Sequence, residues 1–186
     1  MKRSIGCLML LICVATMGSG CISRLAKEGI GVATGAKGLY APIQPVDVDK
    51  EARPLGQYKR FELGQIADDF GGKAPPALWA SLDEHFPEQL AAKKLPNDPA
   101  GKTLLVRGKV LHYEDASMLG FALGPLEEVV ARIELVDKDT GRVLGVANCI
   151  GRTTESVNSG VPKKGEGLAK AIVAWIESRY PKDGRQ

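Results

Sequence analysis

The chain has 186 residues, of which 44% are hydrophobic and 25% are charged, a composition typical of a globular domain. Its formal net charge is +3, and residues 1–20 contribute two of the positive charges and no negative one, so the remainder carries +1. A chain this close to neutral lacks the positive field that nucleic-acid binding requires, and we therefore expect no nucleic-acid partner.

The first twenty residues have the composition of an export signal. Lys2 and Arg3 precede an uncharged apolar run over residues 5–17. A helix of about 13 residues is roughly 20 Å long, which is too short for a hydrocarbon core of about 30 Å. Gly18, Ser19 and Gly20 then supply the small side chains that a signal peptidase needs. The sequence therefore predicts a signal peptide over residues 1–20.

Cys21 directly follows these small residues, an arrangement that resembles the lipobox of bacterial lipoproteins, although Gly18 stands where that motif usually has leucine. The resemblance implies that Cys21 is acylated and becomes the mature N-terminus, so that the chain meets the membrane through its lipid. Ile22 rather than aspartate follows the cysteine, which implies outer-membrane retention with the domain facing the periplasm. Plain secretion and an uncleaved anchor are the alternatives.

Residues 21–57 show little apolar periodicity, and we expect them to form the lipidated N-terminus and a flexible tether. Glycine and proline punctuate this segment, at Gly29, Gly31, Gly35, Gly38, Pro42, Pro45 and Pro54.

A single folded domain is expected over residues 58–181, followed by a polar tail over residues 182–186. Its first strand is predicted near residues 58–66, and a helix begins at Pro75-Pro76, where a missing N–H costs nothing. Pro87 is predicted to kink this helix or to begin a second piece. The apolar stripe of the helix consists of Leu78, Leu82, Phe86 and Leu90.

Three strands are predicted next, over residues 102–113, 127–137 and 142–151. In the second of them Arg132 and Glu134 alternate with apolar residues, which indicates one covered and one wet face. Gly141 is suited to the tight turn before the third strand. A second helix near residues 166–179 carries the stripe Leu168, Ile172, Trp175 and Ile176.

The order strand, helix, three strands, helix predicts an α/β fold of the α+β type. We expect a two-layer sandwich in which two helices pack on one face of a mainly antiparallel four-stranded sheet.

Three motifs occur in a characteristic order: Leu105-Val106-x-Gly108, the Asp-x-x-Thr-Gly turn within residues 134–144, and Gly167-Leu-Ala-Lys170 at a helix start. This order resembles an uncharacterised family of small bacterial lipoproteins, a domain of unknown function with a lipobox and a two-layer α/β core. The resemblance covers about residues 58–180. It implies the fold above and assigns no catalytic residue.

Residue types that could support catalysis or metal binding are few. His85 and His112 lie on different predicted elements and lack the spacing of a zinc-binding helix. Cys149 lies in an apolar strand, where a buried, inert thiol is expected. Asp137 and Asp139 are explained by turn formation rather than by calcium binding. We expect no catalytic residue, metal or cofactor; an envelope hydrolase with an unrecognised site is the alternative.

Residues 116–126 form a long, uncharged connection between two predicted strands. A solvated loop is usually polar, so the apolar side chains here either tuck under the sheet as a flap or contact a partner. The side chains concerned are Met118, Leu119, Phe121 and Leu123.

Together these features predict a non-catalytic, membrane-anchored envelope lipoprotein that acts as a binding or assembly component. Its partner is expected to be an envelope protein or a second copy of itself. An oligomerising accessory protein of a secretion or assembly machine is a further alternative.

The Cys21→Ser variant tests the anchor. Without the thiol the chain stays unacylated, and we expect it to leave the detergent phase in a phase-partition assay. Each buried CH₂ of an acyl chain contributes about 0.8 kcal/mol of membrane affinity, which a nearly neutral domain does not replace. A serine variant that stays fully membrane-bound contradicts the lipoprotein prediction.

Overall fold

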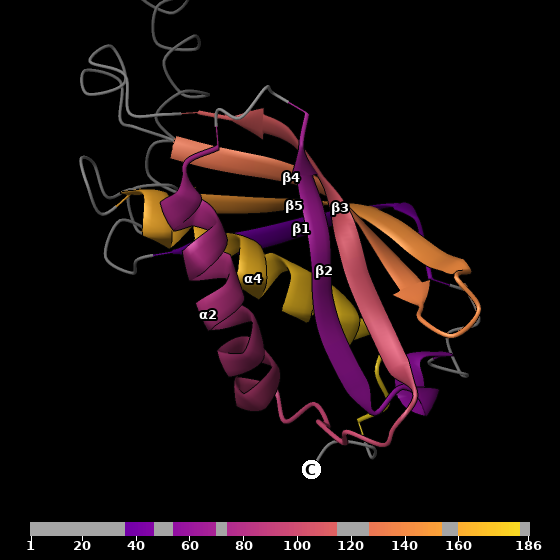
Figure 1. The fold of residues 1–186 in the computed structure, drawn as a ribbon. Coiled ribbons are helices and arrows are strands. Elements are labelled where there is room, and N and C mark those ends of the chain that lie inside the picture. The colour runs from indigo at the N-terminus through magenta and orange to yellow at the C-terminus, as the bar shows by residue number, and fades with distance from the viewer. Residues whose placement is uncertain (1–35, 47–53, 70–73, 115–126, 154–159, 183–186) are drawn as a thin grey trace, which may run out of the picture. The chain divides into compact units, whose positions relative to one another are not determined.

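The computed structural model describes residues 36–46, 54–69, 74–114, 127–153 and 160–182. Cys21 and the loop residues Met118, Leu119, Phe121 and Leu123 lie outside these ranges. The described elements, in chain order, are β1 (Lys37–Gln44), the 3₁₀ helix η1 (Pro54–Gln57), β2 (Arg60–Asp68), α2 (Pro76–Ala92), β3 (Thr103–Tyr113), β4 (Glu127–Asp137), β5 (Val143–Thr153) and α4 (Gly160–Ser178) (Figure 1).

The strands form one sheet in the order β1-β5-β4-β3-β2. The pair β2–β3 is parallel, and the other three pairs are antiparallel. The predicted α+β class and the mainly antiparallel sheet are confirmed.

The predicted number of four strands is wrong, because the sheet has five. The additional strand, β1, lies inside residues 21–57, for which the sequence predicts a tether. Pro42 is tolerated there because β1 is an edge strand, so the missing N–H interrupts pairing on one side only. The sheet therefore begins before residue 58.

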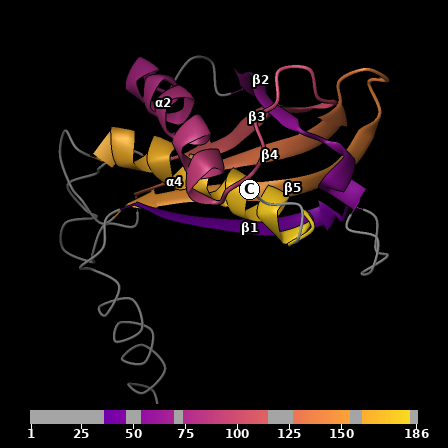
Figure 2. The same ribbon diagram turned by 90° about the horizontal axis from the view of Figure 1, so that it is seen from below.

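Helices α2 and α4 lie on the same side of the sheet (Figures 1 and 2). The apolar stripes predicted for both helices are buried, and so are the alternating residues Val129, Ala131, Ile133 and Leu135 of β4. Helix α2 continues through Pro87 as one element, so the alternative of a second helical piece is wrong. Helix α4 begins at Gly160, earlier than predicted. No helix in the described ranges is both long and apolar enough to cross a bilayer.

Helix α4 lies directly against the backbone of the sheet at three glycines. A Cβ atom added to Gly151 of β5 would lie 2.2 Å from the carbonyl oxygen of Lys164, and one added to Gly167 of α4 would lie 2.6 Å from that of Lys37. A Cβ on Gly38 of β1 would lie 2.4 Å from the amide nitrogen of Ala171. These distances leave no room for a side chain, so glycine at all three positions permits the contact.

The opposite face of the sheet is covered by none of the described elements. It carries the residues that alternate with the core, such as Arg107 of β3 and Arg132 of β4, which are both exposed. We call this surface the open face.

The Gly151→Ala variant tests the helix–sheet contact. Forcing a methyl group into a closed space costs about 1–3 kcal/mol. We expect a loss of this size in the free energy of unfolding, measured by urea denaturation with tryptophan fluorescence.

Gly141→Asn is the matched control. Gly141 has a φ of 70° in the hairpin turn, and nothing lies within 4 Å of an added Cβ. Asparagine tolerates this conformation, so the loss is expected to be smaller, about 1 kcal/mol or less. Equal losses in the two variants contradict the proposed importance of the contact.

Candidate functional site

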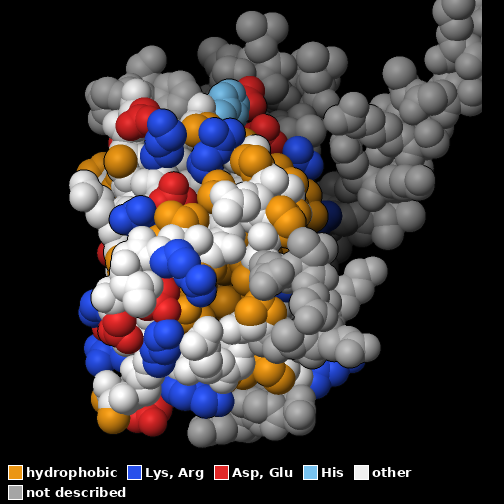
Figure 3. All heavy atoms as spheres, turned by 90° about the vertical axis from the view of Figure 1, so that its right-hand side faces the viewer, with side chains coloured by type: hydrophobic (Ala, Val, Ile, Leu, Met, Phe, Trp, Pro, Cys, Tyr) orange, Lys and Arg blue, Asp and Glu red, His pale blue; other side chains and the backbone are white. Residues whose placement is uncertain are grey.

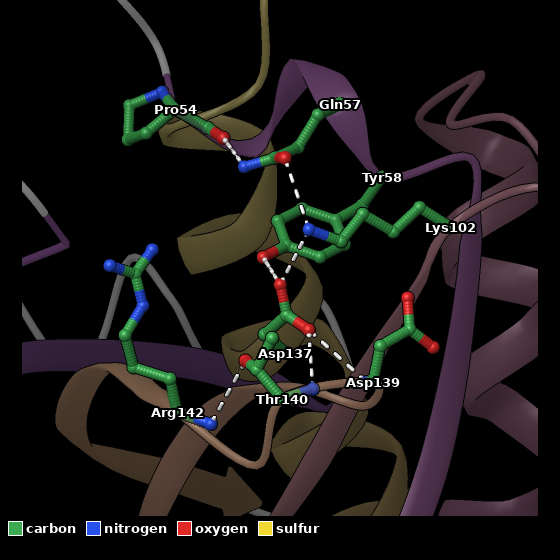
Figure 4. Close-up of polar contacts among 8 residues, drawn as sticks. All are labelled: Pro54, Gln57, Tyr58, Lys102, Asp137, Asp139, Thr140 and Arg142. Atoms are coloured by element: carbon green, nitrogen blue, oxygen red, sulfur yellow. Dashed lines mark hydrogen bonds and ion pairs between the residues drawn. The ribbon is translucent and has the colours of Figure 1, made fainter.

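Asp137, the last residue of β4, joins three parts of the chain at one end of the sheet (Figure 4). It is only 2% exposed. Its Oδ2 atom accepts a hydrogen bond from the Tyr58 hydroxyl at 2.8 Å and pairs with Lys102 Nζ at 2.6 Å. Its Oδ1 atom accepts from the backbone N–H groups of Asp139 and Thr140, each at 3.1 Å. Both oxygens are therefore engaged.

The surroundings of this carboxylate favour its charged form. The hydrogen bond from Lys102, followed by that from Tyr58, holds the pKa of Asp137 well below its usual range. Burial, reinforced by the hydrogen bond to Asp137, raises the pKa of Tyr58 above its usual value. Lys102 also contacts Gln57 Oε1 at 3.2 Å.

This geometry assigns Asp137 a structural role. The carboxylate closes the turn after β4 and ties it to residues before β2 and β3, while Asp139 is exposed. The turn explanation predicted for these two aspartates agrees with this geometry.

The open face is a second candidate site, and strand pairing arranges its side chains in rows. One row is apolar, with Leu39 of β1, Ile150 of β5 and Val130 of β4 in register. The next row is polar and basic: Asn148 of β5 pairs with Arg132, which pairs with Lys109 of β3. Figure 3 shows hydrophobic side chains gathered beside Lys and Arg side chains on this face.

The apolar part of the open face extends along the edge strand. Leu39 is 50% exposed and Ile43 is 53% exposed, the large hydrophobic side chains most open to solvent in the described part of the chain. With the apolar row that contains Leu39, they add exposed apolar surface of the kind that protein partners cover.

A shallow depression of about 460 Å³ lies on the basic part of the open face. The pairing of β2 with β3 shifts register between Leu63 and Ile66, and Gln65, within this shift, lines the depression. Such irregularities are common at sheet edges, and β2 is an edge strand. The walls of the depression consist of Gln65, Ala67, Leu105, Arg107, Gly108, Lys109, Arg132 and Glu134.

The three cations of the depression have weak partners. Arg107 Nε lies 2.9 Å from Glu134 Oε2, and Lys109 Nζ lies 2.9 Å from Asp69 Oδ2. Arg132 Nε contacts the amide oxygen of Asn148 at 3.4 Å rather than a carboxylate. Exposed ion pairs contribute about 0–1 kcal/mol, so a partner's carboxylates can replace them at small cost.

The residues considered for catalysis are not brought together. His85 Nδ1 contacts Glu88 Oε2 at 2.6 Å on α2, whereas His112 is half exposed on β3. Cys149 is buried in the core, and this burial raises the pKa of its thiol to about 12. Within the described ranges, no three His, Cys, Asp or Glu side chains gather to hold a metal ion.

Two features of the structure could not be recognised in the sequence. Lys164 precedes the helix predicted near residues 166–179, yet it is fully buried at the start of α4. Its Nζ atom donates to the carbonyl oxygen of Glu114 at 2.7 Å and lies 4.3 Å from the centre of the Tyr113 ring. Arg107 and Lys109 were not predicted as site residues either. Their side chains share one face, because residues two apart in a strand point the same way.

Comparisons with known proteins identify no family. No family model matches the chain, and no curated protein does. The predicted family membership therefore stays a prediction.

Solved structures resemble the chain weakly. The PelC dodecamer from Paraburkholderia phytofirmans has a TM-score of 0.47 at 15% identity, over 74% of this chain and 96% of that chain. A minor lipoprotein from Acinetobacter baumannii has a TM-score of 0.41 at 15% identity, over 64% and 93%. A PDZ domain protein from Parabacteroides distasonis has a TM-score of 0.40 at 18% identity, over 88% and 40%. Similarity at this level identifies no function.

The Asp137→Asn variant tests the structural role of Asp137. Hydrogen bonds to a charged group contribute about 1.5–3 kcal/mol, and we expect a loss of about this size at pH 7 in urea denaturation. The variant Asp139→Asn makes the same chemical change at an exposed position, where we expect a change within about 0.5 kcal/mol.

The contribution of Asp137 to the free energy of unfolding depends on pH in a defined direction. Because the folded-state pKa of Asp137 lies below its unfolded value of about 3.9, its contribution is complete above that pH and is lost as the pH falls further. The difference in the free energy of unfolding between wild type and Asp137→Asn should therefore become smaller in acid. A difference that is constant with pH contradicts this assignment.

Proposed function

We propose that this protein is a non-catalytic lipoprotein of the bacterial cell envelope and that the open face of its α/β domain is its binding surface. Acyl chains on Cys21 hold it at the outer membrane, with the domain facing the periplasm. It acts there as a binding or assembly component.

The open face is the observation that supports this proposal. Two helices cover one side of the sheet, whereas the other side presents exposed Leu39 and Ile43 on the edge strand β1 and a depression lined by Arg107, Lys109 and Arg132 of β3 and β4. Apolar side chains next to weakly paired charges are typical of protein interfaces with an apolar centre and a polar rim.

The perturbed pKa values of Asp137 and Cys149 are explained without a catalytic role, which is compatible with a binding function. The carboxylate of Asp137 is saturated by its own chain, and the thiol of Cys149 is buried and kept protonated. Neither presents a reactive group to a substrate.

A labelling experiment on isolated membranes tests the binding surface. We expect a cysteine introduced by Leu39→Cys to react several-fold more slowly with a maleimide in membranes than after detergent extraction, because a partner covers it. Cys149 gives no background while it is buried.

Asn97→Cys is the control, because Asn97 is exposed in the loop between α2 and β3, whereas Leu39 lies on β1 at one edge of the sheet. Its labelling should be equally fast before and after extraction. If Leu39→Cys labels as fast as Asn97→Cys in membranes, the open face is not a binding surface there.

A further inference from the structure

We propose that the open face of one copy binds the exposed face of helix α2 of a second copy, so that copies associate head to tail. This inference rests on the proposed function, because it names the partner of the open face.

Helix α2 presents a surface opposite in charge to the open face. Its 17 residues, Pro76–Ala92, include no lysine or arginine. The carboxylates of Asp83, Glu84 and Glu88 are all exposed. His85 contacts Glu88 at 2.6 Å and is the one basic side chain of the helix.

Around these carboxylates the helix surface is small and apolar. Ala77, Ala80 and Ala91 are exposed, and so is Pro87. Short side chains let a helix approach a sheet closely, while the buried stripe of α2 is already occupied by the core of its own domain.

The spacing of charges on the two surfaces is similar. Glu84 and Glu88 are one helical turn apart, about 6 Å along the helix. On the open face Arg107 and Lys109 are two residues apart on β3, about 7 Å, and Lys109 lies directly opposite Arg132 on the next strand. Carboxylates on successive turns of a helix can therefore meet successive cations of the depression.

The mixed charge of the open face favours a protein helix over a uniformly anionic polymer. Glu62, Glu128 and Glu134 lie on the outward-facing side of the strands, among the cations, and each is paired to arginine there. A dense row of negative charges would be repelled by these carboxylates, whereas α2 offers only three carboxylates, with exposed alanines on either side of them.

The contact is of the heterologous type, since it joins two different surfaces of the same domain. The acidic helix faces of two copies would repel each other, as would two basic depressions. A symmetric dimer through either surface alone is therefore disfavoured, and the contact repeats from copy to copy.

Charge reversal on each surface tests this inference in the full-length protein in detergent micelles. One variant carries Lys109→Glu with Arg132→Glu, and the other carries Glu84→Lys with Glu88→Lys. We expect each to weaken self-association in sedimentation velocity on the order of tenfold, because like charges then face each other across the contact. Association of the wild type should also fall with rising salt.

Mixing the two variants distinguishes a head-to-tail contact from other modes. Each variant keeps one intact surface, so a 1:1 mixture should form pairs that neither forms alone. A variant carrying all four reversals should associate again. The control, Arg142→Glu with Lys182→Glu, changes two exposed cations outside both surfaces and should associate like the wild type.

The remaining outcomes separate this inference from the proposed function. If the wild type is monomeric, or if the reversals leave association unchanged, the second copy is not the partner. Protection of Leu39→Cys in membranes would then show that the open face binds something else, and the proposed function would stand. A monomer whose Leu39→Cys is also unprotected overturns both.

Discussion

The contact between α4 and the backbone of the sheet is the constraint on which the other packing depends. Gly38, Gly151 and Gly167 remove the side chains that would otherwise separate the two layers. With α4 this close to β5 and β1, its apolar stripe reaches the core residues of the central strands, and α2 packs beside it. Both helices in the described part of the chain are thereby placed on one side of the sheet, and the open face is the consequence.

The Asp137 cluster has a comparable role at the end of the sheet. One buried carboxylate accepts hydrogen bonds from Tyr58, Lys102 and its own turn, so residues distant in sequence are held together by charge in addition to the apolar packing of Tyr58. The pKa values of Asp137 and Tyr58 are perturbed, as those of catalytic groups often are. Both oxygens of Asp137, however, already accept hydrogen bonds from its own chain. The perturbed pKa of Asp137 therefore marks a structural group rather than a reactive one.

The open face was predictable only in part. Alternation in residues 127–137 already places Arg132 on a wet face, because side chains in a strand alternate with a period of two. That Arg132 lies opposite Lys109, and that Leu39, Ile150 and Val130 form one apolar row, depends on the register between strands far apart in the chain. Local periodicity carries no information on that register, and so the depression could not be recognised from its residues.

The sequence by itself determined the elements from β2 to α4, because their apolar periodicity, the Asp-x-x-Thr-Gly turn and Pro75-Pro76 act through local geometry. It also predicts an export signal over residues 1–20 and a lipid site at Cys21, both of which lie outside the described residues. Only the tertiary structure decided that residues 37–44 are a strand. Gly38 and Pro42 are locally typical of a linker, yet Gly38 admits the backbone of α4 and Pro42 fits an edge strand. Both reasons lie in neighbours more than 100 residues away along the chain, which no local pattern records.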